Sequence, residues 1–239
     1  MYSQTVSLFY RTKSIMVAAI LALIATLWAL SEGMNRIKVF TLLLLPTMFT
    51  LGVGSFYFLL PTRWLTRLPV DALFGLAMYF LLLSQNVFNV ASSRTIPLYR
   101  AASTATFLFT VLTAWLLYHI LHAFGLPFVF NGLASFMISF LLIAPALWAV
   151  KMDEFTLEIF IYSLGLSLIQ AEIAIALSFW PIPANSMMWS IGLTSSLFVL
   201  LGLALDHFRE RLGKSEISMY IQTVVVVLLV IFLTTKWTG

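Results

Sequence analysis

The stretch "ISMYIQTVVVVLLVIFLTT" spans residues 217–235 and holds no charged side chain in its 19 positions. A helix that crosses the hydrocarbon core of a bilayer, which is roughly 30 Å thick, needs about 20 predominantly apolar residues. The stretch therefore predicts a membrane-spanning helix near 217–236.

Similar apolar runs, bounded by charges or prolines, recur along the whole chain. They predict helices near 14–31, 37–60, 70–92, 101–124, 128–150, 155–180, 186–206 and 217–236. We expect an all-α fold: a polytopic integral membrane protein, a bundle of about eight transmembrane helices, forming one integral membrane domain over 1–239. The longest connections are about a dozen residues, too short for a soluble catalytic domain.

The composition supports this class and limits the partners. Hydrophobic residues make up 62% of the 239 positions and charged residues 9%, against about 25% charged in a soluble domain. The net charge is +4, and the Lys and Arg residues concentrate between the runs, as in flanks that contact anionic headgroups. We expect the lipid bilayer as a partner and no nucleic acid. Cysteine is absent, so disulfides and thiolate sites are excluded.

Three amides lie near the end of the predicted third helix: Gln85, Asn86 and Asn89. At about 100° per residue, they share one face with the two serines that follow. An unpaired amide is costly in hydrocarbon, so we expect bonds to neighbouring helices, each contributing on the order of 0.6–2 kcal/mol. The alternative is that this face lines a binding site.

Glu172 lies deep within the predicted sixth helix. A carboxyl at that depth either pairs with another group or stays protonated, and an intramembrane ionisable group is a candidate for function. Glu158, Gly165 and Glu172 share one face because they are spaced by seven, and Gly165 would permit a close neighbour. A functional role and a structural, hydrogen-bonded role both stay open.

His119 and His122 end the predicted fourth helix on the same membrane side as Glu172. If the fourth and sixth helices touch, His119 and Glu172 would form a proton-relay pair. The alternative is two interfacial histidines. We also expect interfacial tryptophans near the helix ends, namely Trp64, Trp115, Trp148, Trp180, Trp189 and Trp237.

Motifs for chemistry are missing from the sequence. It contains no Gly-rich phosphate loop, no H-E-x-x-H, no G-x-S-x-G and no Asp-rich metal motif. The three histidines do not have the spacing of a zinc site. We therefore expect no catalytic residues, no metal and no cofactor.

The Lys and Arg residues predict an orientation through the positive-inside rule. With eight crossings, eight of them lie on one side of the membrane and five on the other. The connections around Pro127 and over 180–186 carry none. We expect these two connections and both termini on the outside, although four basic residues, Arg11, Lys13, Arg63 and Arg67, oppose this orientation.

Several stretches together resemble a known family of proteins: "LLLLPTMFTLGVGSFYFLLPTRWLTRLPV" (42–70), "QNVFNVASSRTIPLYRAA" (85–102), "ALSFWPIP" (176–183), "RERL" (209–212) and "TTKW" (234–237). The family is an uncharacterised one of polytopic membrane proteins, with a domain-of-unknown-function label, from bacteria with very small genomes. The resemblance implies a bacterial cytoplasmic (inner) membrane and a complete, uncleaved chain. It implies no activity, ligand or site residue.

The sequence favours a non-enzymatic envelope scaffold or assembly component, whose partner is another membrane protein or a lipid. The first alternative is a small-molecule, lipid or ion translocator that uses the amide face of the third helix and Glu172. The second alternative is a lipid-modifying membrane enzyme. A translocator requires a water-accessible cavity that reaches Asn89 or Glu172, whereas a scaffold requires dry helix contacts.

Overall fold

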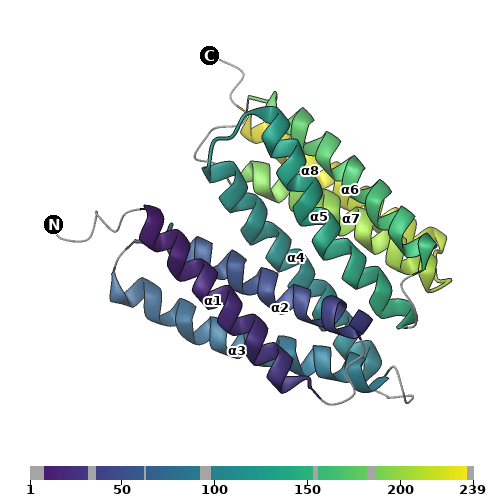
Figure 1. Cartoon of the computed structure of the whole chain (residues 1–239). Helices are drawn as coiled ribbons and strands as arrows, with labels where there is room; N and C mark the ends of the chain where they lie inside the picture. The colour runs from purple at the N-terminus through teal and green to yellow at the C-terminus, as the bar shows by residue number, and fades with distance from the viewer. Residues whose placement is uncertain are drawn as a thin grey trace. The chain divides into compact units, whose positions relative to one another are not determined.

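A computed structural model describes residues 8–31, 36–61, 63–91, 98–152, 156–181 and 187–235. These residues form eight helices (Figure 1): α1 (Leu8–Ala29), α2 (Arg36–Tyr57), α3 (Trp64–Ala91), α4 (Tyr99–Ala123), α5 (Phe128–Lys151), α6 (Leu157–Ser178), α7 (Met188–Phe208) and α8 (Lys214–Thr234). All eight are long and apolar enough to cross a membrane. The structure confirms the predicted all-helical, multi-pass membrane protein.

Two helices, α3 and α1, begin well before the predicted residue. α3 begins at Trp64 rather than near residue 70, and Pro69 lies inside it. A proline near the start of a helix removes only one backbone hydrogen bond, so it is an unreliable marker of a boundary. The hydroxyl of Thr66 donates to the carbonyl of Arg63 at 2.7 Å in the first turn. α1 begins at Leu8 rather than near residue 14, because a helix can continue beyond the apolar run.

The chain divides into two compact units, Met1–Thr113 and Ala114–Gly239, and the division falls inside α4. In the first unit, α2 packs against both α1 and α3. Phe49 of α2 lies at the centre of this unit and is 2% exposed. Its ring centroid lies 5.8 Å from that of Phe74 on α3 and 5.8 Å from that of Phe109 on α4. Phe49 thus joins three helices.

The second unit is built on the pair α5 and α6, and α7 packs against α5, α6 and α8. Gly132 allows the close approach of α5 to α6, because a Cβ placed there would lie 2.7 Å from the side chain of Ile175. Trp148 and Trp189 are each 1% exposed. These two tryptophans belong to the core of the unit, so placing them in the interfacial belt was wrong.

Candidate functional site

The three predicted amides of α3 divide between two surfaces. Gln85 and Asn89 are 3% and 5% exposed, whereas Asn86 is exposed. Gln85 and Asn89 are four residues apart and lie one above the other, but Asn86 is turned by about 100° from Gln85. The amide nitrogen of Asn89 donates to the carbonyl of Leu30 at 3.4 Å. Asn89 therefore ties α3 to the end of α1, as a helix-joining amide does.

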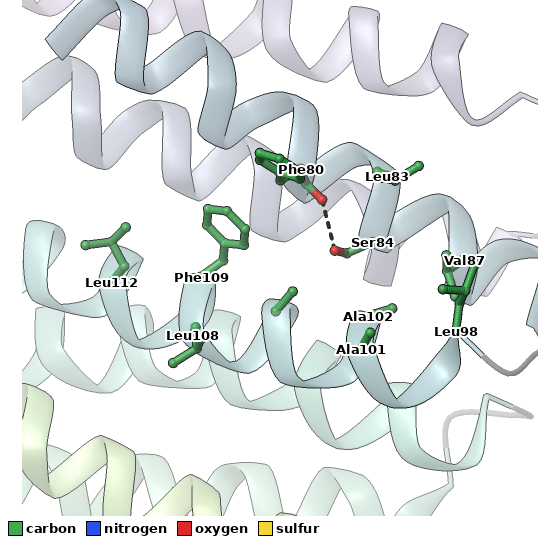
Figure 2. A pocket seen from close by; sticks show the side chains of 11 residues that line it. Phe80, Leu83, Ser84, Val87, Leu98, Ala101, Ala102, Leu108, Phe109 and Leu112 are labelled. Carbon is green, nitrogen blue, oxygen red and sulfur yellow. Dashed lines mark hydrogen bonds between the residues drawn. The ribbon is translucent and has the colours of Figure 1, made fainter. Parts of the chain in front are cut away.

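α3 and the part of α4 that belongs to the first unit enclose an apolar groove of about 460 Å³ (Figure 2). Its walls are formed by Phe80, Leu83, Ser84, Val87, Leu98, Ala101, Ala102, Ala105, Leu108, Phe109 and Leu112. Ser84 is the one polar residue among them, and its hydroxyl donates to the carbonyl of Phe80 at 2.9 Å. The groove thus suits an apolar occupant such as an acyl chain.

The second unit contains a buried polar cluster that the sequence analysis did not identify. It consists of Tyr118 (α4), Ser139 (α5), Gln170 (α6) and Ser196 (α7). The hydroxyls of Tyr118 and Ser139 share a hydrogen bond of 2.7 Å. One pair of hydroxyls joins α4 to α5, and the side chains of Gln170 and Ser196 join α6 to α7.

Gln170 is the centre of this cluster and is fully buried, at 0% exposure. Its amide nitrogen donates to the carbonyl of Leu193 at 2.6 Å, and its amide oxygen accepts from the hydroxyl of Ser196 at 2.9 Å. Both polar atoms of the amide are therefore used between helices. Ser196 also lines an apolar cavity of about 250 Å³ between α6, α7 and α8.

A signal for the buried face of α6 that carries Gln170 was present in the sequence. Ser163, Ser167 and Gln170 recur at intervals of four and three residues, which places them on one helical face. All three are 0% exposed. The serines donate to carbonyls of their own helix, those of Ile159 and Ser163, at 2.7 and 2.6 Å. Spacing indicated the face, but the interhelical partners of Gln170 are visible only in the folded chain.

The structure does not join His119 to Glu172. The ring nitrogen Nδ1 of His119 lies 3.4 Å from the hydroxyl of Ser190, and the His119 ring stacks on Trp115 with centroids 6.0 Å apart. Glu172 is exposed and has no hydrogen bond or ion pair with any described residue. The predicted proton-relay pair therefore finds no geometric support.

Glu172 faces away from the interior of the second unit. On α6 the buried polar residues Ser163, Ser167 and Gln170 lie on the side opposite to it. Gly165, on the side of Glu172, has nothing within 4 Å of where a Cβ would stand. A charged side chain within a membrane-spanning helix costs roughly 2.5–3.5 kcal/mol on insertion scales. The outward-facing carboxyl of Glu172 therefore lies at an energetically unfavourable position within α6.

One end of the second unit gathers charged and aromatic groups. Lys151 forms an ion pair with Glu158 at 2.6 Å, and its ammonium lies 5.1 Å above the ring of Phe208. The hydroxyl of Tyr220 donates to the carboxylate of Asp206 at 2.8 Å. These contacts join the ends of α5, α6, α7 and α8, where a polar membrane boundary is expected.

Among the described residues, no group of three or more His, Cys, Asp or Glu side chains is placed to hold a metal ion. Comparison of the chain with protein-family models, curated proteins and solved structures finds no match.

Proposed function

We propose that this multi-pass membrane protein is a non-enzymatic scaffold or assembly component of a bacterial cytoplasmic membrane. The supporting observation is the distribution of polar groups on the described helices. Asn89 and Gln170 point inward and bond to neighbouring helices, whereas Glu172 points outward without a partner in its own unit. Inward groups used in this way hold helices together, and an outward polar group is suited to another molecule in the membrane.

A specific observation favours lipid handling as the second candidate. The groove between α3 and α4 is apolar, and its one hydroxyl, on Ser84, already bonds within its own helix. A lipid translocator would use such a groove for acyl chains. The scaffold remains our first proposal because the polar path that a headgroup needs has no counterpart in the walls of this groove.

Water accessibility of the buried polar positions tests the proposal. The natural sequence has no cysteine, so a single Ser→Cys variant carries one thiol on a nearly unchanged side chain. Ser84→Cys and Ser139→Cys probe buried positions of the two units, and Ser215→Cys is an exposed control at the start of α8. We expect a membrane-impermeant maleimide to label only Ser215→Cys in native membranes when the reagent can reach both membrane faces. Labelling of Ser84→Cys or Ser139→Cys would indicate a water-filled path and favour a translocator.

A further inference from the structure

The last helix, α8, is buried at two points, and at each of them a glycine of α7 permits a close approach. Tyr220 and Ile231 are the two buried residues of α8. A Cβ placed at Gly202 would lie 2.6 Å from the ring of Tyr220. One placed at Gly192 would lie 2.9 Å from the side chain of Ile231. The two contacts are about 16 Å apart along α8, so they hold the helix at both ends of one stretch.

Between these two contacts α7 and α8 do not close on each other, and α6 completes the walls of the cavity of about 250 Å³. Its lining residues all belong to the second unit, so this unit alone defines the cavity. Short side chains leave the space open, among them Ser195 and Ser196 of α7 and Val224 and Val227 of α8. We call it the α8 cavity.

The walls of the α8 cavity offer few partners to water. Their polar side chains are those of Ser195 and Ser196. The hydroxyl of Ser196 already donates to the amide oxygen of Gln170 at 2.9 Å and to the carbonyl of Leu193 at 2.8 Å. A buried water needs about two to four polar partners, whereas an apolar cavity of about 150 Å³ stays dry and can bind benzene. The α8 cavity therefore suits an apolar occupant.

An empty cavity of this size would weaken the second unit, because the atoms of its walls would lose van der Waals contacts on one side. Protein interiors are packed closely enough that few such spaces stay empty. The apolar molecules that surround every helix in a bilayer are lipids. Their acyl chains are narrow and flexible, so they can enter an irregular space between helices.

The α8 cavity lies in one half of the membrane. On α8 its walls run from Val224, the middle residue of the helix, to Ile231 near its end, about 10 Å along the axis. Just beyond, the indole nitrogen of Trp180 donates to the hydroxyl of Thr235 at 2.7 Å, and tryptophans are typical of the membrane boundary. Half of the hydrocarbon core is about 15 Å thick, so the cavity can hold most of one acyl chain, down to its methyl end.

We propose that the α8 cavity is a binding site for one acyl chain of a bilayer phospholipid, which packs between α6, α7 and α8 as part of the folded unit. The site goes beyond the proposed function, since a scaffold and a translocator could both hold such a chain. The lipid belongs to the half of the membrane at the C-terminal end of α8.

Lipid retention by the purified full-length chain tests this site. The chain is extracted from membranes of phosphatidylethanolamine and phosphatidylglycerol, washed with detergent and examined by native mass spectrometry. We expect at least one phospholipid to be retained per chain. A chain that stays folded and retains none refutes the proposal.

A matched pair of substitutions shows whether the retained lipid lies in the α8 cavity. Val227 lines the cavity, whereas Val225 on the same helix is 56% exposed and lies outside its walls. Val227→Phe fills the space, so we expect retained phospholipid to fall at least fivefold. Val225→Phe should leave it unchanged. Equal retention by the two variants would place the lipid elsewhere and overturn the proposal.

Ser195→Leu guards against a folding defect of Val227→Phe, because it fills the same cavity from α7. Thermal unfolding of both variants is compared with that of the natural chain after all three have been stripped of lipid. We expect both variants to unfold at the same or a higher temperature, since their added atoms occupy space that the lipid has left. Lower unfolding temperatures for both would show that protein already fills the space, which also refutes the proposal.

The depth of the bound chain is tested in vesicles of the same two lipids, with a phosphatidylglycerol that carries a diazirine on one acyl chain. With the diazirine near the methyl end, we expect light to attach the lipid to residues 192–200 or 224–231. With the diazirine next to the ester, attachment to these residues should be at least fivefold lower. Equal attachment from the two positions would contradict a chain that lies in the cavity.

Discussion

Gln170 illustrates how a single side chain can organise a membrane unit. It is fully buried, and both of its polar atoms bond to α7. An amide that is satisfied on both sides fixes the rotation of α6 about its own axis, which apolar contacts alone define less sharply. The same rotation directs Glu172 outward, since the two side chains lie on opposite sides of α6.

Replacing Gln170 with leucine should destabilise the second unit by about 1–3 kcal/mol, because the carbonyl of Leu193 and the hydroxyl of Ser196 each lose a partner. Reversible unfolding in mixed micelles measures this change. Gln222→Leu is the matched control, since Gln222 of α8 is exposed and should change stability little. Equal effects of the two substitutions would show that Gln170 does not join helices.

The sequence identified which residue types form the candidate sites better than it identified which way each side chain points. Gln85 and Asn89 are buried as a helix-joining pair requires, but Asn86 was grouped with them and is exposed. The three side chains span a broad arc around the helix. The sequence does not show which part of that arc a neighbouring helix covers. Tyr118 and Ser139 were missed because a tyrosine or serine in an apolar run looks the same whether it faces lipid or another helix.

Among the helices, α7 and α8 form a close pair whose contact depends on a glycine. A Cβ placed at Gly202 of α7 would lie 2.6 Å from the ring of Tyr220, and that ring carries the hydroxyl that bonds to Asp206 at 2.8 Å. The glycine therefore sets both the distance between two helices and the position of a polar contact near the membrane boundary.

Gly202→Ala should displace the Tyr220 ring, weaken its bond to Asp206 and cost about 1–3 kcal/mol of stability, as overpacking does. Gly75→Ala in α3 is the control, because a Cβ there meets nothing within 4 Å; it should be neutral or slightly stabilising. Unfolding in mixed micelles would again compare the two. If Gly202→Ala is as stable as Gly75→Ala, the α7–α8 contact tolerates an extra methyl and our account of it is wrong.

The existence and order of the helices were predictable because eight apolar runs of membrane-spanning length leave few alternatives. Their ends were less predictable. Pro69 suggested a boundary near residue 70, yet α3 continues back to Trp64. An apolar run indicates the part of a helix that lies in the hydrocarbon core. The helical hydrogen bonds can continue beyond that part into the headgroup region.

At the scale of the whole molecule, the eight described helices would begin and end on the same side of the membrane if each crosses it once. The distribution of basic residues predicts that this side is the outside. A reporter enzyme that is active only outside the cytoplasm, fused after residue 239, should therefore be active. The same reporter inserted near residue 213 should be inactive. If a reporter that is active only in the cytoplasm is active at the C-terminus, the predicted orientation is wrong and the opposite one holds.

The serine and threonine hydroxyls bear on how this chain is made. Those of Ser163, Ser167, Thr47 and Thr50 donate to carbonyls within their own helices, at 2.6 to 2.9 Å. A newly synthesised segment whose hydroxyls are already satisfied can enter the bilayer alone, before any neighbour has arrived. The side-chain amide of Gln170 makes no such bond within its own helix, since its hydrogen bonds go to α7. We therefore expect α6 to reach its final position during biosynthesis only after α7 has been made. If the ribosome stalls before residue 188, where α7 begins, α6 should remain dependent on the insertion machinery.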